Sequence, residues 1–188
     1  MRRFPRPEAL LRKLRARGGF SLSEMLACTL ILLLSTTVIM ETMSLAASQM
    51  RSRTRDSEAD MLCGLLAQAV QNRLTCALGC VTDGSPEGKV VSFRSTADGR
   101  PYELCSFAKG SNDGEIALVY TDESGNSKKY DLIASTNYAG SDGHRLGAEL
   151  AVYWQEGRFS VQLAVGEEGG DPITSRDFVV YPVIKSGS

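Results

Sequence analysis

The sequence predicts an α+β fold in which a long N-terminal helix packs on an antiparallel β-sheet head. Two observations lead to this class. Residues 20–78 contain no proline and a single glycine, Gly64, so nothing in them obliges a helix to end. The chain after Gly79 is instead divided by turn-forming residues into short runs that alternate apolar and polar side chains. A head of about 100 residues buries a modest core only if a helix covers one face of its sheet, so the two parts need each other.

Charge is distributed unevenly along the 188 residues, although 21 basic and 22 acidic side chains nearly cancel to a formal net charge of -1. Residues 1–19 hold seven basic side chains and one acidic side chain, so residues 20–188 carry a net charge of -7. Proteins that coat nucleic acid without sequence preference neutralise phosphates with Lys and Arg. The acidic body of this chain therefore excludes a strongly basic nucleic-acid binder.

The first element after this basic leader is an apolar segment. Residues 25–40 form 16 consecutive positions without a charge, between Glu24 and Glu41. A bilayer core requires roughly 17–25 apolar residues, a length that is reached from Phe20 only if Glu24 is included. We expect residues 1–19 to be a leader and residues 20–45 to be the membrane-spanning half of the helix. The basic leader predicts a cytoplasmic N-terminus, with the rest of the chain outside.

Three interpretations of this segment are open: a cleaved secretory signal, a plain anchor, and a helix whose carboxylate has a function. Ser44 and Ala46 are small residues that would suit cleavage by a signal peptidase. Glu24, however, lies where the apolar run of a signal should begin. An ionised side chain at membrane depth is costly and marks a functional site by default. The third interpretation is therefore favoured.

Residues 18–24 read Gly-Gly-Phe-Ser-Leu-Ser-Glu, after a basic leader and before an apolar run. This arrangement resembles the processing site of type IV prepilins and of the related pseudopilins. The resemblance implies that a prepilin peptidase cuts between Gly19 and Phe20 and that the amino group of Phe20 is methylated. It also implies that Glu24, the fifth residue of the mature chain, pairs with the Phe20 amine of a neighbouring subunit, because a carboxylate in an apolar bundle must be paired.

Many major pilins carry a proline late in the apolar segment, which this chain lacks, so the resemblance favours a minor pilin or pseudopilin. It implies a filament subunit that is processed by the peptidase and is not itself an enzyme, with other pilin subunits, an inner assembly platform and the membrane as partners. No cofactor is expected. The subunit would span the membrane once, with an extracytoplasmic head, and would be extracellular after assembly. Nucleic acid would be a partner only in a machine for DNA uptake. The alternative is an anchored or secreted binding domain without a filament.

Residues 46–79 continue the helix in amphipathic form and should pack on the head. An apolar stripe at helical spacing supports this prediction; it consists of Met61, Leu62, Leu65, Leu66, Ala69, Val70 and Leu74. A continuous helix over residues 20–78 would be a rod of roughly 90 Å, ending near Gly79. A separate surface helix joined by a loop to the anchor would carry the same stripe.

Residues 80–188 are predicted to form the extracytoplasmic β domain. The clearest hairpin pairs residues 150–155 with 158–165 across the turn Glu156-Gly157. A second hairpin pairs residues 116–121 with 130–134. Further strands are expected at residues 90–93, 102–107 and 178–184.

Four cysteines lie outside the apolar segment, which itself contains Cys28 as a small apolar residue. An even number in an oxidising compartment suggests disulfides. In a helix unbroken to residue 78, Cys63 would lie about 20 Å from Cys76, far beyond the roughly 7 Å that a disulfide allows between Cα atoms. Cys63 with Cys105, and Cys76 with Cys80, are the pairings that remain. Free buried thiols are the alternative, and the spacing disfavours a zinc site.

Two other groups of residues are candidates for functional sites. His144 is the only histidine, and no nucleophile motif accompanies it, so a loop position is expected instead of a hydrolase site. The acidic segments 113–115 and 122–126 resemble calcium loops only in composition, and turn formation explains the same residues. No metal site is predicted.

Overall fold

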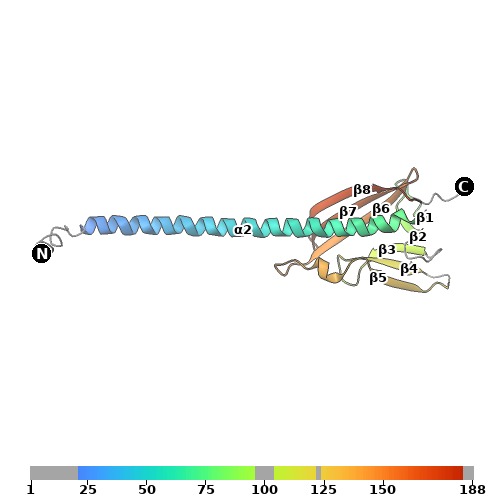
Figure 1. The fold of residues 1–188 in the computed structure, drawn as a ribbon, viewed down its shortest axis with the longest axis horizontal. Coiled ribbons are helices and arrows are strands. Elements are labelled where there is room, and N and C mark those ends of the chain that lie inside the picture. The colour runs from blue at the N-terminus through green and yellow to red at the C-terminus, as the bar shows by residue number, and fades with distance from the viewer. Residues whose placement is uncertain (1–20, 96–103, 122–123, 184–188) are drawn as a thin grey trace, which may run out of the picture. The chain divides into compact units, whose positions relative to one another are not determined.

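The computed structural model describes residues 21–95, 104–121 and 124–183. Its chain divides into two compact units, residues 1–49 and residues 50–188. The long helix α2, Leu22–Thr75, enters both units, and the second unit adds eight strands (Figure 1). The predicted α+β class, a long N-terminal helix packed on antiparallel β structure, is confirmed.

In the apolar part of helix α2, hydroxyl side chains form hydrogen bonds to the backbone of the helix itself. The hydroxyls of Ser35, Thr36 and Thr37 each donate a hydrogen bond of 2.8 Å to the backbone carbonyl three or four residues earlier. These three hydroxyls therefore have partners on an apolar helix surface. The helix ends at Thr75, three residues before the predicted end, because Ala77 is buried and already pairs with Ser95 in a sheet.

The strands form two antiparallel sheets. The five-stranded sheet has the order β1-β2-β3-β4-β5 and consists of Ala77–Thr82, Val90–Ser95, Leu104–Lys109, Ile116–Thr121 and Ser127–Asp131. The three-stranded sheet has the order β6-β7-β8 and consists of Leu146–Gln155, Arg158–Glu167 and Pro172–Val180. A short 3₁₀ helix, η1, covers Ser135–Tyr138 between the two sheets in sequence.

The predicted hairpins are present with adjusted limits. In β6 and β7, Leu150 pairs with Leu163 and Gln155 with Arg158, as the alternating pattern predicted. Strand β5 occupies 127–131 instead of the predicted 130–134. Gly125 has a φ of 82°, which places the tight turn at residues 124–126. Strand β5 therefore begins earlier in the sequence than predicted.

The two sheets meet at two glycines. The N–H of Trp154 donates to the carbonyl of Gly88 over 2.8 Å, and the N–H of Ala148 donates to the carbonyl of Gly114 over 2.7 Å. A Cβ atom on Gly114 would lie 2.7 Å from the Cα of Gly147, closer than real Cβ contacts allow. Because Gly114 also has a φ of 76°, only glycine fits this junction without strain.

The core of the second unit consists of two apolar clusters, and α2 contributes to both. The first contains Ala59, Leu62, Cys63, Leu66, Ala67, Ile116, Tyr138, Leu146, Ala148, Leu163 and Val165. The second contains Val70, Leu74, Ala77, Phe93, Cys105, Leu118, Val152, Phe159, Val161 and Val180. One face of this part of the helix is therefore buried against residues of both sheets. Leu62, Leu66, Val70 and Leu74 of the predicted stripe are buried, whereas Met61 is 67% exposed and the prediction for it was wrong.

Candidate functional site

The first unit presents an apolar helix surface that nothing within the unit covers. Every described residue of this unit is exposed, and its large apolar side chains retain 55–83% of their accessible surface. The helix is long and apolar enough to cross a membrane. Lipid tails or other apolar helices would each cover such a surface. Cys28 lies exposed within it.

Glu24 is the one acidic residue in the first turn of α2. Its Oε2 atom accepts a hydrogen bond of 3.1 Å from the backbone N–H of Ser21, and the hydroxyls of Ser21 and Ser23 lie 2.7 Å apart. The carboxylate therefore caps the helix and faces the positive end of its dipole. The carboxylate is exposed, so a cation from outside the chain can reach it. Gly19 and Phe20, the predicted processing site, lie outside the described residues, as does the basic leader.

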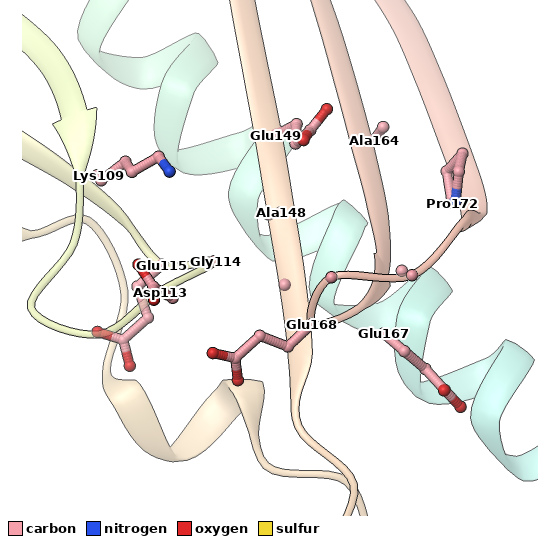
Figure 2. A pocket seen from close by; sticks show the side chains of 14 residues that line it. Lys109, Asp113, Gly114, Glu115, Ala148, Glu149, Ala164, Glu167, Glu168 and Pro172 are labelled. Carbon is pink, nitrogen blue, oxygen red and sulfur yellow. The ribbon is translucent and has the colours of Figure 1, made fainter.

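The second unit contains a pocket of about 530 Å³ between the ends of the two sheets (Figure 2). Five carboxylate residues line it, together with Lys109 and several glycines. The carboxylates belong to Asp113, Glu115, Glu149, Glu167 and Glu168. Among the residues that the structure describes, no group of three or more His, Cys, Asp or Glu side chains is arranged to hold a metal ion.

Glu115 differs from the other pocket carboxylates because only 2% of its surface is exposed. It accepts hydrogen bonds from the Ser135 hydroxyl over 2.5 Å and from the Asn112 amide over 2.8 Å, and it forms an ion pair with Arg145. Burial raises the pKa of Glu115, but the hydrogen bonds and the guanidinium outweigh burial and lower it below its ordinary value. These bonds give Glu115 a structural role at the corner between residues 112–115 and Ser135. Asp122 and Glu123 of the second acidic segment lie outside the described residues.

Tyr138 supports the same corner of the head from inside the core. Its side chain is fully buried, and its hydroxyl oxygen accepts a hydrogen bond of 3.0 Å from the N–H of Ile116, the first residue of β4. Burial raises the pKa of Tyr138. Sequence reasoning missed the structural roles of Glu115 and Tyr138. Asn112 is close to Glu115 in sequence, but its other partners and the Ile116 partner of Tyr138 lie 20 or more residues away.

His144 lies exposed on the turn after η1, and its Nε2 atom is 2.7 Å from Nη2 of Arg55. Arg55 also forms an ion pair of 2.8 Å with Glu167. The His144 ring thus contacts an arginine of α2. The contact connects α2 to the head, a relation that the sequence did not reveal.

Cys63 and Cys80, one member of each predicted disulfide, are free thiols in the structure. Cys63 is a buried free thiol in the first cluster, whereas Cys105 belongs to the second cluster. Cys80 is a free thiol opposite Phe93 on extended strand β1, and the three residues from Ala77 to Cys80 span about 10 Å. The structure therefore forms neither predicted bridge, and both remain predictions for the oxidised protein. Burial raises the pKa of the Cys63 and Cys80 thiols, which makes both less reactive.

Comparison with known proteins adds no relative to this description, since the chain matches no family model, no curated protein and no solved structure.

Proposed function

We propose that the chain is a type IV pilin-like subunit, a minor pilin or pseudopilin that is cleaved after Gly19 and assembles through its N-terminal helix. The observation that carries this proposal is the uncovered apolar surface of α2 with a carboxylate in its first turn. A plain anchor needs the apolar surface but has no use for Glu24 at membrane depth. A subunit that moves from lipid into a helical bundle uses both features.

The proposed mechanism is an exchange of environments for the apolar surface. Before assembly, residues 20–45 lie in the membrane, with the leader in the cytoplasm and the head outside. During assembly the same side chains leave lipid and pack against the helices of other subunits, driven by close packing and by the pairing of polar groups. The Glu24 carboxylate then pairs with the methylated Phe20 amine of a neighbour. Because this pair is buried in an apolar bundle, it fixes the axial register between subunits.

The partners follow from this mechanism. They are a prepilin peptidase, other pilin or pseudopilin subunits and an assembly platform in the membrane. The chain is the substrate of the peptidase and does no catalysis of its own. DNA would be a partner only if the filament serves uptake, because residues 20–188 carry a net charge of -7.

A second candidate function is an anchored binding domain that forms no filament. The pocket of about 530 Å³ favours it, since pockets of 300–1,000 Å³ commonly hold small ligands. On this alternative, Glu24 caps the helix and does nothing else.

The deciding experiment is the N-terminal sequence and intact mass of the chain recovered from host membranes. The proposal expects an N-terminal Phe20 with one added methyl group. An intact Met1 would leave a plain anchor, and an N-terminus at Ala47 would leave a secreted head domain. Either result would overturn the assembly mechanism.

Glu24→Ala separates the two candidate functions once cleavage is established. We expect this variant to be cleaved normally and to be lost from sheared filaments. Glu41→Ala is the matched control, because Glu41 is an exposed carboxylate at the other end of the same apolar run. Equal recovery of both variants in filaments would show that Glu24 is incidental.

A further inference from the structure

The turn that carries His144 is a compact structure fastened to helix α2. An isolated bridge between Ala139 and Arg145 closes the turn, and the N–H of Gly140 donates to the carbonyl of His144 over 2.8 Å. The backbone N–H of Ser141 then donates to Oε1 of Glu58 on α2 over 3.1 Å. The turn is thus attached to the helix at Ser141 as well as at His144.

The contact between His144 and Arg55 depends on the protonation state of the imidazole ring. A guanidinium group has only donors, so a hydrogen bond across the 2.7 Å between Nη2 of Arg55 and Nε2 of His144 requires Nε2 to accept. Such a bond forms only with a neutral ring that carries its proton on Nδ1. Arg55 is held in place on its other side, because its Nη1 donates to Oε1 of Glu167 over 2.8 Å.

We infer that His144 is a protonation-controlled latch: the neutral ring fastens the turn at residues 139–145 to α2, and protonation releases the turn. A proton added at Nε2 removes the acceptor and places two cations in contact. Histidine is the side chain whose charge ordinarily changes between pH 5 and 8. Release uncovers Arg55 and Glu58 on the helix. The inference rests on the head alone and is independent of the proposed filament function.

The charged groups around the latch make the histidine its switching element. They are Arg55 and Glu58 on α2, Glu167 at the end of β7, Glu168 in the turn that follows, and Asp142 and Arg145 on the turn itself. Carboxylates and guanidinium groups ordinarily keep their charges between pH 5.5 and 7.5. Glu167 could attract a protonated ring, but Arg55 already occupies it. His144 is the only histidine in the chain.

Hydrogen exchange of the full chain in lipid nanodiscs tests the latch directly. The reporter is the amide of Ser141, which donates to Glu58 on α2. Between pH 7.5 and 5.5 we expect its protection, corrected for intrinsic exchange, to fall roughly three- to tenfold, whereas the amide of Gly140, which donates to the carbonyl of His144 within the turn, is the internal reference. Unchanged protection would overturn the inference.

Two substitutions show whether the histidine is responsible. His144→Gln keeps an acceptor for Arg55 but does not titrate, so the turn should stay protected at both pH values. His144→Ala removes the acceptor, so protection should be low at both. If His144→Gln lost protection at pH 5.5 as the unmodified chain does, another group would be the switch and the inference would fail.

A ¹⁵N-histidine spectrum gives a second, independent reading, because a chain made without a histidine tag shows one ring. At pH 7.5 its two nitrogen shifts should report the Nδ1–H tautomer. A predominant Nε2–H tautomer would contradict the geometry on which the latch depends.

Discussion

The two parts of helix α2 share a backbone conformation but differ in what surrounds their apolar side chains. Every described residue up to Gln49 is exposed, including the leucines at 30, 32, 33 and 34. In the later part, one face is buried in the two clusters of the head and the other faces outward. Local sequence therefore determines that both parts are helical. The arrangement of apolar residues around the helix determines which part can bury its apolar side chains within the same chain.

The largest expected effect comes from a cavity in the packed part of the helix. Leu66 is fully buried in the first cluster, so Leu66→Ala should reduce the free energy of unfolding of the head by about 3–5 kcal/mol. Leu33→Ala is the matched control, because Leu33 is 68% exposed. Urea unfolding of the full chain in mild detergent measures both. Similar losses in the two variants would mean that the two parts of α2 do not differ in how their apolar side chains contribute to stability.

The second prediction concerns the polar network at the corner of the head that covers the packed part. Glu115→Ala removes the buried carboxylate that pairs with Arg145 and accepts from Asn112, and should cost about 2–3 kcal/mol of unfolding free energy at pH 7. Glu149→Ala, which removes an exposed carboxylate from the same pocket, should cost little. A comparable loss in the control would mean that general pocket charge, and not the buried network, stabilises the head.

The same network predicts how stability depends on pH. The folded-state pKa of Glu115 lies below its ordinary value of 4.5, so its contribution is complete above that pH and is lost as pH falls through the folded-state pKa. Unfolding curves between pH 7 and 3 should therefore show an acid destabilisation that Glu115→Gln reduces. An identical pH profile for both chains would remove Glu115 as its cause.

The helix and the hairpins were predictable because their signals are local. The turn Glu156-Gly157, with φ values of 50° and 80°, connects β6 and β7 in the predicted register. The division into two sheets was not predictable, because it depends on contacts such as Trp154 with Gly88 between residues far apart in sequence. The helix end was misplaced for the same reason, since pairing of Ala77 with Ser95 competes with helix propensity.

The residues of the candidate sites also differ in whether the sequence alone reveals them. Glu24 could be singled out because a charge interrupts an apolar run, which is visible in the sequence itself. The contact of His144 with Arg55 joins residues 89 positions apart, and the burial of Glu115 results from partners on three separate segments. Neither has a local signal, so only the folded chain reveals them.

A smaller effect is expected from the buried tyrosine that touches the packed part of the helix through the first cluster. Tyr138→Phe keeps the ring but leaves the buried N–H of Ile116 without its acceptor, at a cost of about 1–2 kcal/mol of unfolding free energy. Tyr130→Phe, on exposed strand β5, is the control and should be neutral. A neutral Tyr138→Phe would indicate that water replaces the hydroxyl and that this corner is open to solvent.

The smallest effect tests the outward face of the packed part. A Cβ atom on Gly64 would have no neighbour within 4 Å, so Gly64→Ala adds no clash and removes the entropic penalty of glycine in a helix. Unfolding of the full chain should show a gain of about 0.5–1 kcal/mol. Under the proposed function, recovery of the variant in filaments provides the second measurement. A variant that is more stable yet assembles less would place a neighbouring subunit against Gly64, whereas equal assembly would leave the outward face of the head helix in solvent and confine subunit packing to the apolar part of α2.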